Sequence, residues 1–94
     1  MLSVGRASNN DLVIRSQMVS KFHATFSVRD GQWELTDQGS SNGTFVDKGR
    51  LEPKRPVEVG NGSEISFSTS TSFVFYDASR LYAVLRMLRD RLED

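Results

Sequence analysis

Residues 35–46 read LTDQGSSNGTFV, and this stretch decides the fold. Leu35 at one end and the run Thr44-Phe45-Val46 at the other are residue types that are common in β-strands. Between them, residues 39–43 are all Gly, Ser or Asn, which favour turns because Gly and Asn tolerate a positive φ. The stretch therefore predicts a strand, a polar loop and a second strand.

A second strand-like run lies upstream at residues 22–28, FHATFSV, in which apolar residues alternate with other types. A period of two predicts a half-buried strand. The residues expected on its core face are Phe22, Ala24, Phe26 and Val28. Further short strands are predicted at residues 12–14, 33–35, 57–59, 64–67 and 72–76. Turn residues separate these runs at the spacing of an antiparallel sandwich, so the predicted fold class is all-β.

The C-terminal residues change to a helical period. Leucines recur at spacings of four, three and four, at Leu81, Leu85, Leu88 and Leu92. This pattern predicts an amphipathic α-helix over residues 78–94, after a β-domain at residues 1–77, with Asp77 or Ser79 as its N-cap. The helix either packs on the sandwich or leads into a neighbouring domain, or its leucines form a two-heptad seam for a homodimer.

Composition excludes several functional classes. The chain has 94 residues, so it holds one compact domain, and its 12 basic and 12 acidic residues cancel. A net charge of zero gives no general attraction for nucleic acid or for an anionic membrane. There is no Cys and a single His, so we expect no disulfide, no metal site and no cofactor. With no apolar signal segment or membrane span, the sequence favours a cytoplasmic protein.

Two patterns imitate hydrolase sites. Residues 39–43 spell G-x-S-x-G, but a nucleophile elbow needs a helix after it, whereas Thr44-Phe45-Val46 predicts a strand. The other pattern is the presence of the triad residue types Ser20, His23 and Asp37, for which a small antiparallel domain offers no evident oxyanion hole. We therefore predict that the protein is not an enzyme.

The residues that carry chemistry are anion-binding types near predicted turns. Arg6 follows a glycine, Ser20-Lys21 precedes a strand, and Ser41-Asn42-Gly43 lies in the central loop. A guanidinium group can bind a phosphate through two parallel hydrogen bonds, and hydroxyl and turn amide groups donate further bonds. If these loops gather at one end of the sandwich, they form a cradle for an anion.

The order of these motifs resembles that of the forkhead-associated (FHA) domain, a phosphothreonine-binding module. The matching motifs are Gly5-Arg6, Asn10-Asp11-Leu12, Ser20-Lys21-x-His23-Ala24 and the central stretch from Leu35 to Val46. The resemblance covers about residues 2–76. It implies a SMAD/FHA-type β-sandwich that binds phosphothreonine-containing partner proteins in signal transduction. The alternative is a phosphate-independent interaction or dimerisation module that uses the C-terminal helix.

The resemblance also implies a role for individual residues. The expected phosphate contacts are Arg6, Ser20, Lys21 and Ser41. Asn42 is expected to bind the backbone of the phosphopeptide, and Met18 to select the third residue after the phosphothreonine. The residues expected to shape the loops are Gly5, His23, Gly43 and Thr44.

Two features depart from the family pattern. Lys21 stands where Arg is common, which replaces a planar fork of donors with a point charge. Only four residues precede Gly5, where relatives usually have another strand. Either the sequence is a piece of a longer protein, or something else covers the exposed sheet edge, for which the C-terminal helix is a candidate.

Overall fold

The computed structural model describes residues 1–69 and 71–93 and consists of short strands followed by one helix. The strands are β1 (Leu2–Gly5), β2 (Leu12–Val13), β3 (Ala24–Arg29), β4 (Gln32–Asp37), β5 (Thr44–Val46), β6 (Gly49–Arg50), β7 (Val57–Val59), β8 (Glu64–Phe67) and β9 (Ser72–Val74). The helix is α1 (Ala78–Glu93). The predicted all-β class with a C-terminal helix is confirmed.

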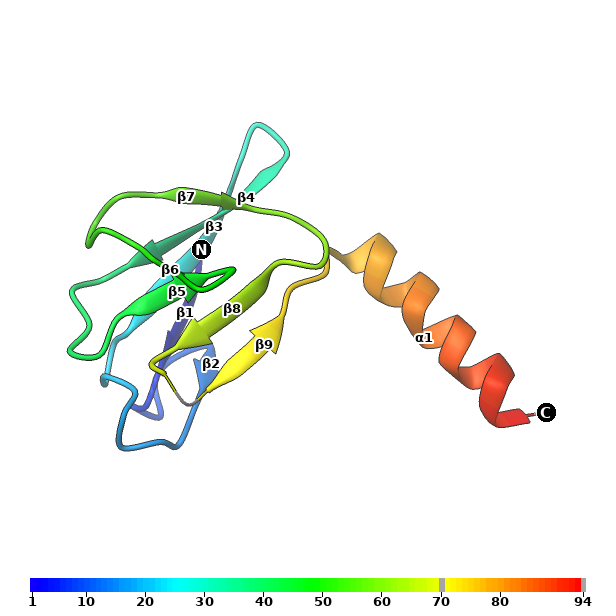
Figure 1. Cartoon of the computed structure of the whole chain (residues 1–94), viewed down its shortest axis with the longest axis horizontal. Helices are drawn as coiled ribbons and strands as arrows, with labels where there is room; N and C mark the ends of the chain where they lie inside the picture. Colours follow the sequence, from blue (N-terminus) through cyan, green and yellow to red (C-terminus); the bar gives the residue numbers. More distant parts are fainter. Residues whose placement is uncertain (70, 94) are drawn as a thin grey trace.

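Two sheets pack against each other as a sandwich (Figure 1). The first has five strands in the order β2-β1-β3-β4-β7, and the second has four in the order β6-β5-β8-β9. All pairings are antiparallel except that of β1 with β2, which is parallel. Strand β2 is an edge of the first sheet and β9 is an edge of the second, and both edges lie on the same side of the sandwich (Figure 1).

The core lies between the sheets and follows the period-two pattern of each strand. The buried apolar side chains are Val4, Val19, Ala24, Phe26, Leu35, Leu51, Val59, Ile65 and Phe67. Aromatic rings join the two layers, since Phe26 stacks on Phe75 at 5.9 Å and meets Phe67 edge-on at 6.5 Å.

The predicted core face of residues 22–28 is only half right. Ala24 and Phe26 are buried, but Phe22 is 48% and Val28 is 55% exposed. Phe22 precedes the first residue of β3, so it is outside the ladder. Val28 lies near the β3–β4 turn, where it pairs with Trp33. Alternation within a strand does not reveal how far the opposite sheet extends.

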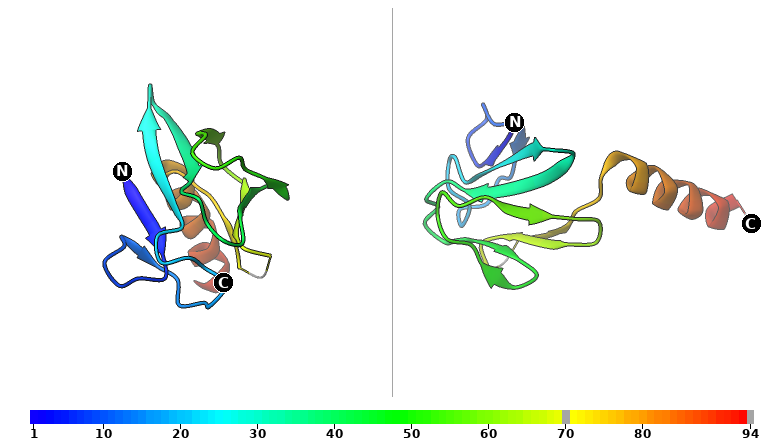
Figure 2. Two further views of the ribbon diagram at one scale, coloured as in Figure 1. Left: turned by 90° about the vertical axis from the view of Figure 1, so that its left-hand side faces the viewer. Right: turned by 90° about the horizontal axis from the view of Figure 1, so that it is seen from above.

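The helix leaves the sandwich rather than covering its edge, as Figure 1 and the right panel of Figure 2 show. Asp77 is the N-cap, because its Oδ1 accepts a hydrogen bond from the Arg80 N–H at 2.9 Å. Asn61 holds Asp77 in turn: its Oδ1 accepts the Asp77 N–H at 2.8 Å, and its Nδ2 donates to the carboxylate at 3.0 Å. The helix, one candidate for covering the sheet edge, therefore does not cover it.

The leucine seam of the predicted homodimer can be assessed at one position. Leu85 is 54% exposed. The side chains of Leu81, Leu88 and Leu92 lie outside the described residues.

Candidate functional site

Three loops meet at the end of the sandwich away from α1: residues 6–11, residues 14–23 and residues 38–43 (Figure 1). Arg6 joins the first loop to the second. Its backbone N–H donates to the Ser20 carbonyl at 2.9 Å, and its Nε donates to the Val19 carbonyl at 3.1 Å. The guanidinium group is thus oriented beside Ser20, and the four N–H bonds of its terminal nitrogens are donors that the Val19 bond does not use.

Gly5 permits the close approach of these two loops. A Cβ atom built on Gly5 would lie 2.2 Å from the Lys21 carbonyl oxygen, so any side chain would push β1 and the loop before β3 apart. The same carbonyl accepts hydrogen bonds from the Ala7 N–H at 3.2 Å and from Asn10 Nδ2 at 2.7 Å. The backbone of Lys21 is therefore held on both sides, while its side chain is exposed.

Ser20 connects the second loop to the third. Its Oγ accepts a hydrogen bond from the Ser41 N–H at 3.0 Å. Because that bond uses a lone pair of the hydroxyl oxygen, the hydroxyl hydrogen is still available to a ligand. The Ser41 residue is exposed, so both hydroxyl groups lie near the same surface.

His23 braces the same two loops from inside. It is fully buried, its Nδ1 accepts the Ser20 N–H at 3.0 Å, and its Nε2 lies 2.9 Å from the Gly43 carbonyl oxygen. A backbone N–H can only donate, so Nδ1 carries no proton and Nε2–H is the donor to Gly43. The imidazole is neutral in this arrangement and acts as a rigid spacer between Ser20 and Gly43.

The third loop is wound around the Asp37 carboxylate. Asp37 is 2% exposed. Its carboxylate accepts hydrogen bonds from the Ser40 hydroxyl at 2.5 Å and the Thr44 hydroxyl at 2.7 Å. It also accepts the backbone N–H groups of Gly39 at 3.1 Å and Ser40 at 3.2 Å. Burial by itself would raise the pKa of Asp37, but these bonds outweigh it and hold the pKa below its ordinary value. Thr44, fully buried, is thus a structural residue.

Gly43 closes this loop at a φ of 88°, a conformation that other residues rarely adopt. A Cβ atom there would also lie 2.9 Å from Arg50 Nε. The Gly43 N–H donates to the Ser40 hydroxyl at 3.1 Å, while the Gly43 carbonyl accepts from His23.

Asn42 and Met18 are brought together across the second and third loops. Asn42 Nδ2 donates to the Met18 carbonyl at 2.8 Å. This bond uses one of the two N–H groups of the carboxamide and none of its carbonyl oxygen. Met18 is 44% exposed, so its side chain is accessible beside Asn42.

Sequence reasoning missed three residues that organise the loops: Asp37, Ser40 and Asn10. Asn10 and Ser40 were visible only as part of a family motif, and Asp37 otherwise only as a residue type of a hydrolase triad. The available signal was local, because Asp and Asn side chains near glycines commonly bind the backbone of their own turn. What the sequence could not reveal is that Asn10 reaches Lys21, eleven residues away.

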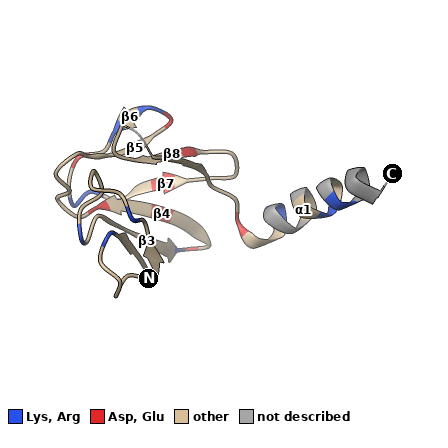
Figure 3. Ribbon diagram, turned by 90° about the horizontal axis from the view of Figure 1, so that it is seen from below, with Lys and Arg blue, Asp and Glu red and all other residues tan. Residues whose placement is uncertain are grey.

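The surroundings of the site carry charges of both signs. Figure 3 shows Lys and Arg interspersed with Asp and Glu over the sandwich. Among the described residues, no group of three or more His, Cys, Asp or Glu side chains is placed to hold a metal ion. Within the same residues, no helix is long and apolar enough to span a membrane.

Known proteins resemble this chain in sequence and in fold. An Arabidopsis thaliana FHA domain-containing protein is 32% identical over 74 residues, which are 78% of this chain and 19% of that protein. The structure of Mycobacterium tuberculosis EmbR in complex with a low-affinity phosphopeptide matches with a TM-score of 0.72 and 29% identity, over 80% of this chain and 19% of that one. The N-terminal FHA domain of Saccharomyces cerevisiae Rad53p, in complex with a phosphothreonine peptide, shares the fold with a TM-score of 0.76 at 22% identity, over 85% of this chain and 69% of that one.

The curated relatives are longer than this chain. It spans 19% of the Arabidopsis protein and 51% of an oxoglutarate dehydrogenase inhibitor of Corynebacterium jeikeium. The family model of the FHA domain matches residues 2–68, which is more than half of the chain. FHA domains are modules that recognise phosphorylated motifs, not enzymes. The three-loop site thus lies within the matched region, and the chain belongs to the FHA domain family.

Proposed function

We propose that this protein binds a phosphothreonine-containing segment of a partner protein across its three loops. The observation that carries the proposal is the hydrogen bond from the Ser41 N–H to Ser20 Oγ, beside the oriented guanidinium group of Arg6. These contacts hold several hydrogen-bond donors in a small region before any ligand arrives. Binding to a preorganised site costs less free energy than binding to loops that must first be ordered.

Four side chains are assigned to the phosphate. Arg6 supplies a fork of charged donors, Ser20 and Ser41 supply hydroxyl groups, and the Lys21 ammonium supplies a second positive charge. A phosphate group carries a charge of about −1.5 to −2 at pH 7, and its oxygens accept all of these bonds. The residues that hold the donors in place are Gly5, His23, Gly43 and Thr44.

Two side chains are assigned to the peptide on either side of the phosphothreonine. The bond to Met18 uses one N–H of the Asn42 carboxamide, so its second N–H and its carbonyl oxygen can bind the C=O and N–H of a peptide backbone. Met18 is apolar, adaptable and 44% exposed. We assign it to the third residue after the phosphothreonine and expect an apolar preference there.

The expected affinity follows from these contacts. Each charge-assisted hydrogen bond contributes roughly 1.5–3 kcal/mol. After the cost of ordering a flexible peptide, three or four such bonds leave about −8 kcal/mol, which is a dissociation constant in the micromolar range. The interaction is non-enzymatic and needs no cofactor. We place it in the cytoplasm, in agreement with the cysteine-free sequence.

The direct test is a titration followed by fluorescence anisotropy. Three labelled peptides of one sequence carry phosphothreonine, phosphoserine or unmodified threonine. We expect the phosphothreonine peptide to bind at least about fourfold more tightly than the phosphoserine peptide, because burial of the threonine methyl contributes about 0.8 kcal/mol. The unmodified peptide should not bind measurably, and equal binding of all three would refute the proposal.

A substitution of Arg6 locates the site. Arg6→Ala should weaken phosphothreonine binding by at least about 2 kcal/mol, because a desolvated phosphate loses its main charged partner. Arg29→Ala is the matched control, since Arg29 is an exposed arginine on the β3–β4 hairpin. An Arg6→Ala protein that is folded and binds as tightly as the control would contradict the assignment.

A phosphate-independent module that dimerises through α1 is the second candidate. The exposure of Leu85, at 54%, is the observation in its favour. Sedimentation of the full chain against a chain that ends at Asp77 tests it. A dimer that needs residues 78–94 would support this candidate. The same number of chains per particle in the two proteins would exclude it.

A further inference from the structure

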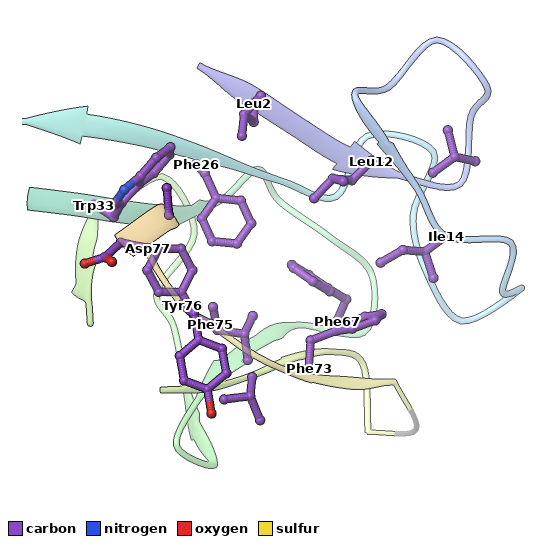
Figure 4. Close-up of a pocket in the computed structure, with 14 residues that line it drawn as sticks. Leu2, Leu12, Ile14, Phe26, Trp33, Phe67, Phe73, Phe75, Tyr76 and Asp77 are labelled. Atoms are coloured by element: carbon purple, nitrogen blue, oxygen red, sulfur yellow. The ribbon is translucent and has the colours of Figure 1, made fainter. Parts of the chain in front are cut away.

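The second sheet presents different side chains on its two faces. On the inner face, the rings of Phe67 and Phe73 point into the space between the sheets (Figure 4). Thr44 pairs with Phe67, and Phe45 is the next residue along the strand, so Phe45 points to the outer face. Arg50 pairs with Phe45 across the β5–β6 ladder and therefore shares that outer face.

The head group of Arg50 lies against the third binding loop. A Cβ atom built on Gly43 would be 2.9 Å from Arg50 Nε, 3.2 Å from Arg50 Cζ and 3.2 Å from the Phe45 ring. The guanidinium group and the aromatic ring thus border the same point of the backbone, and the ring limits the freedom of the guanidinium group. Gly43 directly follows Asn42, so Arg50 lies one residue, or about 3.8 Å along the backbone, beyond the side chain assigned to the phosphopeptide.

The positive charge of Arg50 has no partner among the described residues. Arg50 is exposed, and within that part of the chain its guanidinium group forms neither a hydrogen bond nor an ion pair. The Asp37 carboxylate, which the third loop surrounds, is buried and already accepts four hydrogen bonds. The five N–H groups of the Arg50 head group are therefore donors for a ligand beside the loop.

We propose that Arg50 determines specificity by binding the carboxylate of an aspartate or glutamate that flanks the phosphothreonine. This inference rests on the proposed function and assigns one more recognised side chain of the partner segment. A guanidinium group binds a carboxylate through two parallel hydrogen bonds. An extended peptide advances about 3.3 Å per residue, so the acidic residue lies within about two positions of the one that Asn42 binds.

The charges around the loops favour an acidic residue over a basic one. Arg6 and Lys21 are assigned to the phosphate, whose charge of about −1.5 to −2 offsets theirs. Arg50 adds a further positive charge, which attracts a carboxylate and repels a lysine or arginine of the peptide. Because the Debye length is about 8 Å at physiological ionic strength, this preference is confined to the peptide positions near Arg50.

A series of labelled phosphothreonine peptides tests the proposal by fluorescence anisotropy. The reference peptide has alanine at every flanking position, and each other peptide replaces one alanine with aspartate or with lysine. With the original chain, aspartate at one position should raise the affinity about two- to fivefold over the reference peptide, which is the range of exposed ion pairs. Lysine at the same position should lower the affinity.

Substitutions of Arg50 assign this preference to one side chain. In Arg50→Gln the gain from aspartate should disappear, and in Arg50→Glu lysine should be preferred to aspartate at the same position. Each affinity is compared with that of the reference peptide for the same protein, so a general loosening of the loop does not imitate the effect. Arg29→Gln is the matched control: it removes the same charge from an exposed residue of the β3–β4 hairpin and should keep the gain.

Two results would overturn the role of Arg50. One is that aspartate brings no gain at any position with the original chain, and the other is a gain that persists in Arg50→Gln. Phosphothreonine binding itself stands in both cases, provided that the reference peptide binds to the original chain. If the reference peptide does not bind, the proposed function is refuted, and the role of Arg50 with it.

Discussion

At the scale of single residues, Asp37 shows how a buried charge can shape a loop without contacting a ligand. Its carboxylate accepts four hydrogen bonds from three residues of its own loop and the following strand. Of these donors, the Thr44 hydroxyl is fully buried, and leaving such a group without a partner costs about 1–3 kcal/mol. The carboxylate therefore fixes the path of the backbone on which Ser41 and Asn42 are presented.

The lowered pKa of Asp37 makes the stability of the protein depend on pH. The ordinary pKa of the carboxyl is 3.8, and the folded value is lower, so its contribution is complete above about pH 4 and is lost as pH falls through the folded value. Asp37→Asn should lower the free energy of unfolding at pH 7 by about 1.5–3 kcal/mol. This difference from the original protein should shrink in acid. Urea unfolding at pH 7 and pH 3 measures it, and Asp30→Asn, at an exposed turn, is the control. A difference that stays constant with pH would contradict this role.

His23 is expected to act on stability and binding together. His23→Ala leaves the Ser20 N–H and the Gly43 carbonyl without their buried partner and creates a cavity, so the free energy of unfolding should fall by at least about 2 kcal/mol. Affinity for the phosphothreonine peptide should fall as well, because the Ser20 loop loses its brace. Urea unfolding and peptide titration of the same preparation test both effects. Lost binding at unchanged stability would instead make His23 a direct ligand contact.

At the scale of elements, the site depends on how closely strand β1 approaches the loop before β3. Gly5 is the point of contact, since a Cβ atom there would lie 2.2 Å from a backbone oxygen. Gly5→Ala should therefore cost about 1–3 kcal/mol of stability, because backbone atoms must move. Gly60→Ala is the control: nothing lies within 4 Å of its Cβ position, and its cost should be within about 0.5 kcal/mol. Thermal unfolding of both variants compares them, and equal melting temperatures would show that the loop adapts.

The elements were predictable from sequence where local pattern determines them. Local pattern located most of the strands, but not β1 or β6. The Gly- and Asn-rich runs located the turns and the leucine spacing located the helix, since each signal involves residues close in the chain. The exposure of Phe22 was not predictable because it depends on where β3 begins, and that of Val28 because it depends on how far the opposite sheet extends. The course of α1 was also missed, because it depends on Asn61, which lies sixteen residues before Asp77.

At the scale of the whole molecule, the two ends have separate tasks. The binding loops lie at one end of the sandwich and α1 begins at the other (Figure 1). The Arg80 N–H, and after it the Asn61 carboxamide, hold the pKa of the Asp77 carboxyl below its ordinary value, and the same contacts fix the start of the helix. Among the interactions of the described residues, none joins α1 to Arg6 or Ser20. The zero net charge is compatible with the proposed phosphate recognition, which would rest on a few local donors and not on a general field.

This separation predicts that the helix is dispensable for phosphopeptide binding. A chain that ends at Asp77 keeps every hydrogen bond described for the three loops, so its affinity for the phosphothreonine peptide should stay within about twofold, or 0.4 kcal/mol, of that of the full chain. Anisotropy titration of the two chains side by side measures the affinity, with Arg6→Ala in each chain as the control for specific binding. A loss of affinity much beyond twofold would show that α1 supports the loops, and the separation of the two ends would then be wrong.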